Sequence, residues 1–183
     1  MKVLVAYATR TGGTAGIAER IAERLRAARH EAVVETVAKV PDVAPYDAVV
    51  VGSAVYIGRW QKEAVEFVQR NRTILAERPT WLFSSGPLGK ERTDADGRDK
   101  REAAIPEEIA ALTDAVHPRG HRVFFGVLNP DRLGLGPRLM RLTPAGRKLL
   151  EEGDFRDWAD IEAWADSIAI EVAHSKVPVG VKA

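Results

Sequence analysis

The chain has 183 residues, a formal net charge of +1, an apolar fraction of 45% and a charged fraction of 29%. These values are ordinary for a folded globular domain and exclude disordered, collagen-like and strongly nucleic-acid-binding proteins. The sequence contains no cysteine, so any redox chemistry requires a bound organic cofactor rather than an iron–sulfur cluster or a thiol. We expect a single domain over 1–183 and no nucleic-acid partner.

Five short apolar runs predict the strands of one sheet. The first is nearly continuous, which is typical of a strand buried on both faces of a parallel sheet. The second run alternates apolar and polar residues and predicts an edge strand. The expected strands cover residues 3–8, 32–37, 48–51, 81–83 and 123–127.

Apolar residues at helical spacing predict the helices between these strands. Ile17, Ile21 and Leu25 share one face of a helix whose other face is charged, and Thr14 is a candidate N-cap. The segment 40–46 is too short and proline-rich for more than one or two turns. Further helices are expected over 64–75, over 109–116 with Pro106 in the first turn, and over 158–172 with Asp157 as the N-cap.

Strands that alternate with helices predict a doubly wound α/β sandwich of three layers, because parallel neighbours need right-handed crossover connections. Five parallel strands fit the order 2-1-3-4-5. In that order the topological switch lies between the first and third strands. A ligand is therefore expected at the loops that leave their carboxyl ends.

The loop after the first strand has the composition of an anion site. Its glycines allow a tight turn that presents backbone N–H groups, its threonine hydroxyls can donate, and the next helix adds its positive end. An ordinary strand-to-helix turn is the alternative. The loop matches neither a triphosphate loop nor a dinucleotide loop, which favours the single phosphate of FMN. The candidate phosphate-binding residues are Thr9, Arg10, Thr11, Gly12, Gly13 and Thr14.

Two further loops leave the third and fourth strands toward the same crevice. The loop 52–60 combines small residues for close backbone approach with Tyr56 and Trp60, one of which is expected to stack on the flavin; helix-end packing is the alternative for each. The loop 84–89 supplies hydroxyls and flexible backbone for the pyrimidine end. The candidate flavin-binding residues are Ser53, Ala54, Val55, Tyr56, Ile57 and Gly58 in the one loop, and Ser84, Ser85, Gly86, Pro87, Leu88 and Gly89 in the other.

The sequence predicts no metal site, no membrane span and no catalytic acid or base. The four histidines lack metal-ligand spacing. No stretch reaches the roughly 18 apolar residues of a membrane span. The apolar run at the N-terminus is too short for a signal peptide, so a cytoplasmic protein is expected.

Two segments are distinguished by their charge. Ten of the thirteen residues in 90–102 are charged, which predicts a mobile, solvated loop. The segment 132–150, an insertion after the fifth strand, has five basic residues, no acidic residue and interleaved leucines. It is interpreted as an amphipathic core helix with a basic outer face, or as a surface for an anionic membrane or for the propionates of a porphyrin.

The first loop resembles the phosphate loop Thr/Ser-x-Thr-Gly-x-Thr of the flavodoxin superfamily, which is matched at Thr9, Thr11, Gly12 and Thr14. The whole chain resembles the branch that contains menaquinone-dependent protoporphyrinogen dehydrogenases. The shared features are the Thr-Arg loop, the 52–60 loop, the strand at 123–127 and the Asp157-Trp158 pair.

The resemblance implies a flavodoxin-like fold, bound FMN, reduction by a porphyrin-type substrate and reoxidation by a quinone, with peripheral contact to the inner face of the cell membrane. The chain differs from that branch in two ways. Ile57-Gly58-Arg59 stands where an aromatic-Gly-His run is expected, and the insertion is shorter.

Three functions are weighed. The first is an FMN-dependent oxidoreductase with a quinone as acceptor. The second is a flavodoxin-type electron carrier without its own substrate; such carriers are generally very acidic, so a net charge of +1 disfavours this function. The third is a binding module that has kept the fold and lost the flavin.

Overall fold

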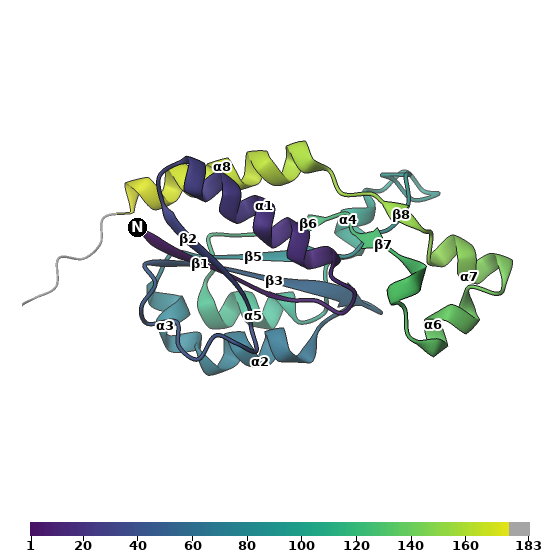
Figure 1. The fold of residues 1–183 in the computed structure, drawn as a ribbon, viewed down its shortest axis with the longest axis horizontal. Helices are drawn as coiled ribbons and strands as arrows, with labels where there is room; N and C mark the ends of the chain where they lie inside the picture. The colour runs from purple at the N-terminus through teal and green to yellow at the C-terminus, as the bar shows by residue number, and fades with distance from the viewer. Residues whose placement is uncertain (176–183) are drawn as a thin grey trace, which may run out of the picture.

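The computed structural model describes residues 1–175 and consists of a parallel sheet between two layers of helices (Figure 1). The sheet has the order β2-β1-β3-β5-β6, with the short β4 paired to β3. The predicted α/β sandwich with the strand order 2-1-3-4-5 is therefore confirmed. The five parallel strands are β1 (Lys2–Ala8), β2 (Glu31–Thr36), β3 (Ala48–Tyr56), β5 (Thr80–Ser85) and β6 (Gly120–Phe124).

Helices cover both faces of this sheet. One face carries α1 (Gly13–Ala27) and α8 (Trp158–His174), and the other carries α2 (Lys62–Arg70), α3 (Arg72–Glu77) and α5 (Ile109–Val116) (Figure 1). β1 is apolar from Val3 to Ala6 because successive side chains alternate between two buried faces. Val3 and Val5 belong to the core cluster that includes α1 and α8, whereas Leu4 and Ala6 belong to the cluster that includes α2 and α5.

The remaining elements are short. Figure 1 shows α6 and α7 beyond one end of the sheet, the end at which β1 leads into α1. β7 and β8 form a separate antiparallel pair beside them. These elements are β4 (Arg59–Trp60), α4 (Lys100–Ala103), β7 (Val127–Leu128), the 3-10 helix η1 (Pro130–Arg132), α6 (Leu135–Met140), α7 (Pro144–Leu149) and β8 (Gly153–Asp154).

The predicted last strand, 123–127, is wrong at its carboxyl end. The sheet strand β6 stops at Phe124, and Val127 pairs instead with Asp154 of β8. Gly126 lies between them and bonds outside the sheet, since its N–H donates to the carbonyl of Pro87 at 2.9 Å. The apolar run is continuous in sequence, but its second half belongs to another sheet.

Two predicted helices are also wrong in their bounds. The single helix expected over 64–75 is two, because the chain breaks at Asn71, whose amide donates to the carbonyl of Phe67 at 2.9 Å. α5 begins at Ile109, so that Pro106 lies in a turn before the helix rather than in its first turn. The N-cap expected at Asp157 is confirmed, since its carboxylate accepts from the N–H of Asp160 at 3.2 Å.

Gly52, near the middle of β3, leaves room for an aromatic cluster. A Cβ atom at this position would overlap the ring of Phe83. The Phe83 ring lies 6.1 Å from that of Phe124 and 6.3 Å from that of Trp164, between centroids. The group that closely approaches the backbone of Gly52 is therefore the core residue Phe83 and not a ligand.

Candidate functional site

The first candidate loop makes a tight turn between β1 and α1. Oγ1 of Thr9 accepts a hydrogen bond from the N–H of Gly12 at 3.0 Å. Gly12 is the N-cap of α1 and has a φ of 89°, in the region that favours glycine. The N–H groups in the first turn of any α-helix have no intrahelical partner, and within residues 1–175 no side chain caps this helix. The prediction that Thr14 is the N-cap is wrong, because Thr14 is buried inside the first turn.

Two arginines from the carboxyl-terminal half of the chain reach this loop. Nη1 of Arg132 donates to the carbonyl of Thr11 at 3.1 Å, and Nη1 of Arg156 donates to the carbonyl of Gly13 at 3.4 Å. The first turn of α1 contains no acidic side chain. The loop therefore combines a helix N-terminus with positive side chains, an environment that stabilises a phosphate.

The second candidate segment, 52–60, is a β-hairpin rather than an irregular loop. β3 continues to Tyr56 and turns through Ile57, with a φ of 51°, and Gly58, with a φ of 72°, into β4. Two consecutive positive φ angles are typical of the type I′ turn of tight hairpins. The guanidinium of Arg10 lies over the Tyr56 ring, with Cζ 4.8 Å from the centroid. This contact joins the hairpin to the first loop.

Ser53 of the candidate set has a structural hydroxyl. The residue is fully buried, and its Oγ donates to the carbonyl of Ala54 at 3.0 Å. The same Oγ accepts a hydrogen bond at 2.9 Å from the N–H of Gln61, and Gln61 is the N-cap residue of α2. The Ser53 side chain therefore holds the start of a helix, and only the backbone at this position remains for a ligand.

The Ser84 hydroxyl is also hydrogen-bonded within the protein, in a network that the sequence did not predict. Its Oγ accepts from Nε1 of Trp60 at 2.8 Å and lies 2.8 Å from Nε2 of His121. Burial lowers the pKa of His121 to about 4, so the imidazole is neutral at pH 7. Trp60 thus packs in the core, which leaves Tyr56 as the aromatic residue of its hairpin that faces the first loop.

The three candidate segments meet at one edge of the sheet because their strands are in register. Ala8 of β1 pairs with Ser53 of β3, and the next residue of β3, Ala54, pairs with Ser85 of β5. The third segment is held in place from the far side, since the N–H of Gly86 donates to the carbonyl of Phe124 at 3.1 Å. Residues 9–14, 53–58 and 84–89 therefore leave neighbouring strands at the switch point, where a doubly wound fold binds its ligand.

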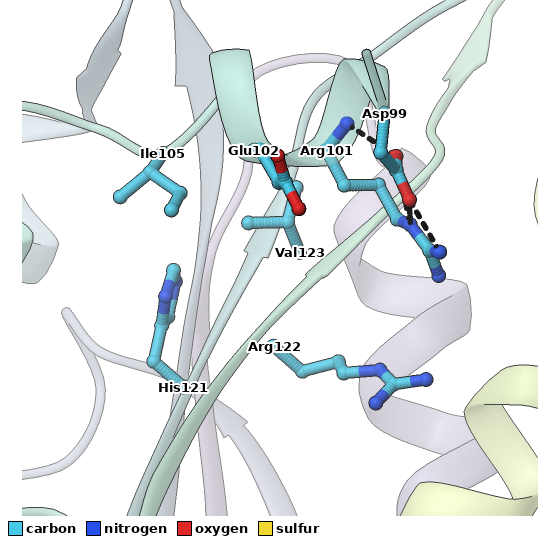
Figure 2. A pocket seen from close by; sticks show the side chains of 7 residues that line it. All are labelled: Asp99, Arg101, Glu102, Ile105, His121, Arg122 and Val123. Atoms are coloured by element: carbon cyan, nitrogen blue, oxygen red, sulfur yellow. Dashed lines mark hydrogen bonds and ion pairs between the residues drawn. The ribbon is translucent and has the colours of Figure 1, made fainter. Parts of the chain in front are cut away.

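A cavity of about 220 Å³ borders the third segment at Gly89. Its other walls come from the charged segment and from the β8 region. The lining residues are Gly89, Lys90, Arg92, Asp154, Phe155 and Arg156. A second cavity, of about 260 Å³, lies between α4 and the edge strand β6 (Figure 2) and is lined by Asp99, Arg101, Glu102, Ile105, His121, Arg122 and Val123, none of which belongs to the candidate site.

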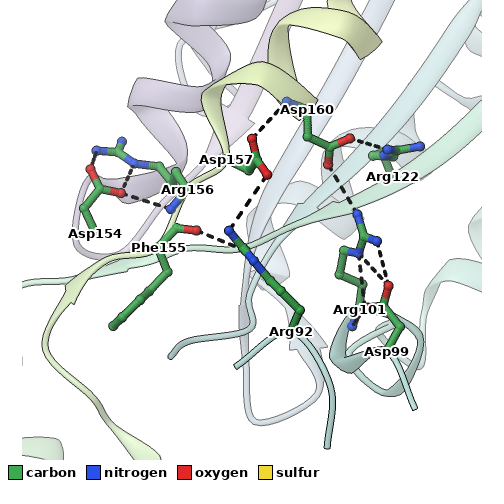
Figure 3. Close-up of polar contacts among 9 residues, drawn as sticks. All are labelled: Arg92, Asp99, Arg101, Arg122, Asp154, Phe155, Arg156, Asp157 and Asp160. Atoms are coloured by element: carbon green, nitrogen blue, oxygen red, sulfur yellow. Dashed lines mark hydrogen bonds and ion pairs between the residues drawn. The ribbon is translucent and has the colours of Figure 1, made fainter. Parts of the chain in front are cut away.

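The charged segment 90–102 is largely exposed, but its three arginines are all paired with carboxylates, two of them as Figure 3 shows. Arg101 bonds to Asp99 at 2.6 Å and to Asp160 at 3.4 Å, and Arg122 also pairs with Asp160. The hydrogen bonds from Arg101 hold the pKa of Asp99 below its usual value. A network of ion pairs thus fastens this segment to the start of α8.

The insertion 132–150 is not the amphipathic core helix that was one of its two interpretations. It forms η1, α6 and α7, and α6 has no buried residue. Leu133 is buried, but most of the insertion's apolar side chains face outward, with Leu135 80% and Leu142 72% exposed. The exposed apolar residues of the insertion are Leu135, Leu139, Met140, Leu142 and Leu149.

No group of three or more potential metal ligands occurs among residues 1–175. Within the same range, every helix is too short or too polar to cross a lipid bilayer.

The fold defines a doubly wound α/β protein whose topological switch lies at the carboxyl ends of its central strands, next to the first loop. The chain belongs to the flavodoxin domain family, whose model matches residues 4–142. Membership of this family supports a flavin-binding protein with a redox role.

Comparisons with individual proteins agree with this assignment. The chain is 25% identical over 179 residues to the protoporphyrinogen IX dehydrogenase [quinone] of Escherichia coli, covering 92% of this chain and 95% of the relative. Among solved structures, it superposes on a flavodoxin from the domain Archaea with a TM-score of 0.60 and 16% identity, over 95% of this chain and 100% of the other. A mutant of the flavodoxin from Pseudomonas aeruginosa gives a TM-score of 0.59 and 15% identity, over 94% and 99% of the two chains.

Proposed function

We propose that this chain binds FMN at the edge formed by 9–14, 53–58 and 84–89, and that it is an oxidoreductase with a quinone as electron acceptor. The observation that carries the proposal is the first loop, where the N-terminus of α1, without a side-chain cap among residues 1–175, lies beside Arg132 and Arg156. A bound flavin supplies hydride and single-electron transfer, and the protein supplies position and electrostatics.

Each of the three segments is proposed to bind a different part of FMN. The N–H groups at the start of α1 and the Thr9 and Thr11 hydroxyls take the phosphate. The Tyr56 ring stacks on the isoalloxazine, and backbone groups of 84–89 take its pyrimidine end. No side chain is assigned as an acid or base, because His121, a partly buried residue of β6, is bonded to Ser84 and lies outside the three candidate segments.

The quinone and a porphyrin-type substrate are proposed from the E. coli relative, which carries both in its name and is matched over nearly all of its length. The whole chain is proposed to be one domain over 1–183; its last eight residues lie outside the described structure. A flavodoxin-type electron carrier is the second candidate, because the chain superposes on flavodoxins. The net charge of +1 favours the enzyme, since a carrier docks through a strongly charged face.

Access to a quinone suggests peripheral contact with an anionic membrane through 132–150. This segment exposes five apolar side chains and carries no acidic residue. Leucines that enter the headgroup region and basic residues that attract anionic lipid reinforce each other. The contact would bring the flavin edge of the sheet near the membrane, since α6 and α7 lie beyond that edge (Figure 1).

Flavin binding and enzyme function are tested in two steps. Titration of FMN with the purified protein, followed by flavin fluorescence, is expected to show saturable quenching. The reduced protein, held without oxygen, is then challenged separately with a menaquinone analogue and with a flavodoxin-dependent reductase. Rapid reoxidation by the quinone supports the enzyme. Transfer to the reductase without reaction with the quinone would assign the carrier instead.

Membrane contact is tested by co-sedimentation with vesicles. Binding is expected to vesicles that contain phosphatidylglycerol and to fall as salt increases, because the basic residues are screened. Absence of the protein from the vesicle pellet at every salt concentration would remove the membrane from the proposal.

A further inference from the structure

Arg132 differs from the other arginines near the first loop because its guanidinium has neither a carboxylate partner nor an aromatic ring beneath it in the described part of the chain. Arg156 is bonded to Asp154 at 2.5 Å, and Arg10 stacks on Tyr56. Arg132 makes one side-chain hydrogen bond, to the carbonyl of Thr11, and no ion pair within residues 1–175. Most of its guanidinium donors are therefore free.

The position of this guanidinium is set by the first loop itself. A Cβ atom at Gly12 would lie 2.5 Å from Nη1 of Arg132, closer than nonbonded atoms can approach. The guanidinium therefore lies against the bare backbone of the residue that caps α1. It occupies the same side of the loop as the positive end of the helix.

The chain around Arg132 is built to hold it there. The η1 turn is capped by the Asn129 side chain, which accepts from the N–H of Asp131 at 2.9 Å. Arg138 of α6 donates to the carbonyls of Pro130 and Asp131 at 3.2 and 2.8 Å. The next residue, Leu133, is buried and anchors the turn to the body of the protein.

We propose that Arg132 is a phosphate ligand of the bound flavin, supplied by the segment after β7, so that cofactor binding and the order of 129–150 are coupled. This inference rests on the proposed FMN site. A guanidinium fork binds two phosphate oxygens with charge-assisted hydrogen bonds, and a monoester carries nearly two negative charges at pH 7. The N–H groups of α1 contact the phosphate from one side and Arg132 contacts it from the insertion side.

The coupling follows from reciprocity. If the phosphate is held by a residue of the insertion, FMN binding stabilises the insertion by as much as the ordered insertion strengthens FMN binding. Riboflavin has the same ring system and no phosphate, so it cannot form the proposed contact with Arg132. The two flavins therefore separate the phosphate contact from all ring contacts.

The first test compares dissociation constants of FMN and riboflavin for the wild type, Arg132→Gln and Arg147→Gln. Arg147 is an exposed basic residue of α7 in the same segment, so its replacement removes an equal charge away from the loop. Arg132→Gln is expected to weaken FMN about tenfold and to leave riboflavin unchanged. Arg147→Gln is expected to leave both flavins unchanged. Arg132→Lys is expected to restore part of the FMN affinity, because it keeps the charge without the fork.

The second test follows trypsin cleavage within 133–150, where basic residues are exposed. FMN is expected to slow this cleavage several-fold in the wild type and not in Arg132→Gln, and riboflavin is expected to have no effect. Equal FMN affinity in the wild type and Arg132→Gln, or equal losses for both flavins, would overturn the inference while leaving the FMN site intact. Failure of the wild type to bind either flavin would instead overturn the proposed function.

Discussion

Two charged regions follow the carboxyl ends of parallel strands, the first loop after β1 and the segment 90–102 after β5, and they differ in how their charges are used. In the network of 90–102 with the start of α8, each of Arg92, Arg101 and Arg122 has a carboxylate partner (Figure 3). Around the first loop, Arg10 and Arg132 have no carboxylate partner among residues 1–175. Paired charges fasten segments together, whereas unpaired charges beside a helix N-terminus are free to hold an anion.

The largest effect is expected from placing a carboxylate in the unpaired region. Gly12→Asp should weaken FMN binding roughly 100-fold, because the new carboxylate repels the phosphate and its Cβ displaces Arg132. The matched control is Gly97→Asp in the paired region. Gly97 also has a positive φ, 81°, and its Cβ would meet no atom within 4 Å. Equal FMN affinity of both variants, measured by fluorescence quenching, would show that the phosphate lies elsewhere.

The next effect concerns His121, which lies between the paired network and Ser84. Its pKa is lowered to about 4 by burial, so between pH 6.5 and 4 the unfolded chain binds a proton that the folded chain does not. The free energy of unfolding should therefore fall by about 2 kcal/mol over this range, allowing for partial exposure. Urea titrations at several pH values are expected to show a smaller fall for His121→Gln and a wild-type fall for His174→Gln, which changes an exposed histidine.

A smaller effect is expected from breaking the paired network at its centre. Asp160→Asn removes the partner of both Arg101 and Arg122 and should lower the free energy of unfolding by about 1 kcal/mol. FMN affinity should not change. Asp114→Asn, at an exposed aspartate of α5, serves as the control in the same urea titration. A loss of FMN affinity in Asp160→Asn would erase the distinction between the two regions.

The smallest effect is expected from loosening the support of Arg132. Arg138→Gln removes the bonds to the carbonyls of Pro130 and Asp131, and FMN affinity should fall about threefold, since the η1 cap at Asn129 remains. Riboflavin affinity is the internal control and should stay constant. A drop as large as that of Arg132→Gln would mean that Arg138 itself contacts the phosphate.

The sheet order and the first loop could be predicted from the sequence because both are local patterns. Buried parallel strands are continuous apolar runs, and Gly12 with its neighbouring threonines forms a short motif directly after one of them. The end of β6 was missed for the same reason. Its apolar run continues to Val127, and only a hydrogen bond from Gly126 to the distant Pro87 shows that the sheet has ended.

The site residues that were missed act across long stretches of chain. Arg132 and Arg156 reach the first loop over 121 and 143 residues, and no spacing rule connects such positions. Ser53 and Ser84 were chosen because hydroxyls in a loop suggest a ligand. Their burial is a property of the strand register, which places both side chains among core residues rather than at the surface.

The hairpin of β3 and β4 also has a dynamic consequence. Trp60 fastens its base to Ser84, whereas Ile57 at its tip is 87% exposed. The base of such a hairpin is rigid because it is held by a buried hydrogen bond, and its tip is more flexible because it is exposed. Tyr56 lies one residue from that tip and beneath Arg10. Movement of the tip is therefore expected to change the angle of the Tyr56 ring, which faces the proposed cofactor site, more than it moves the sheet.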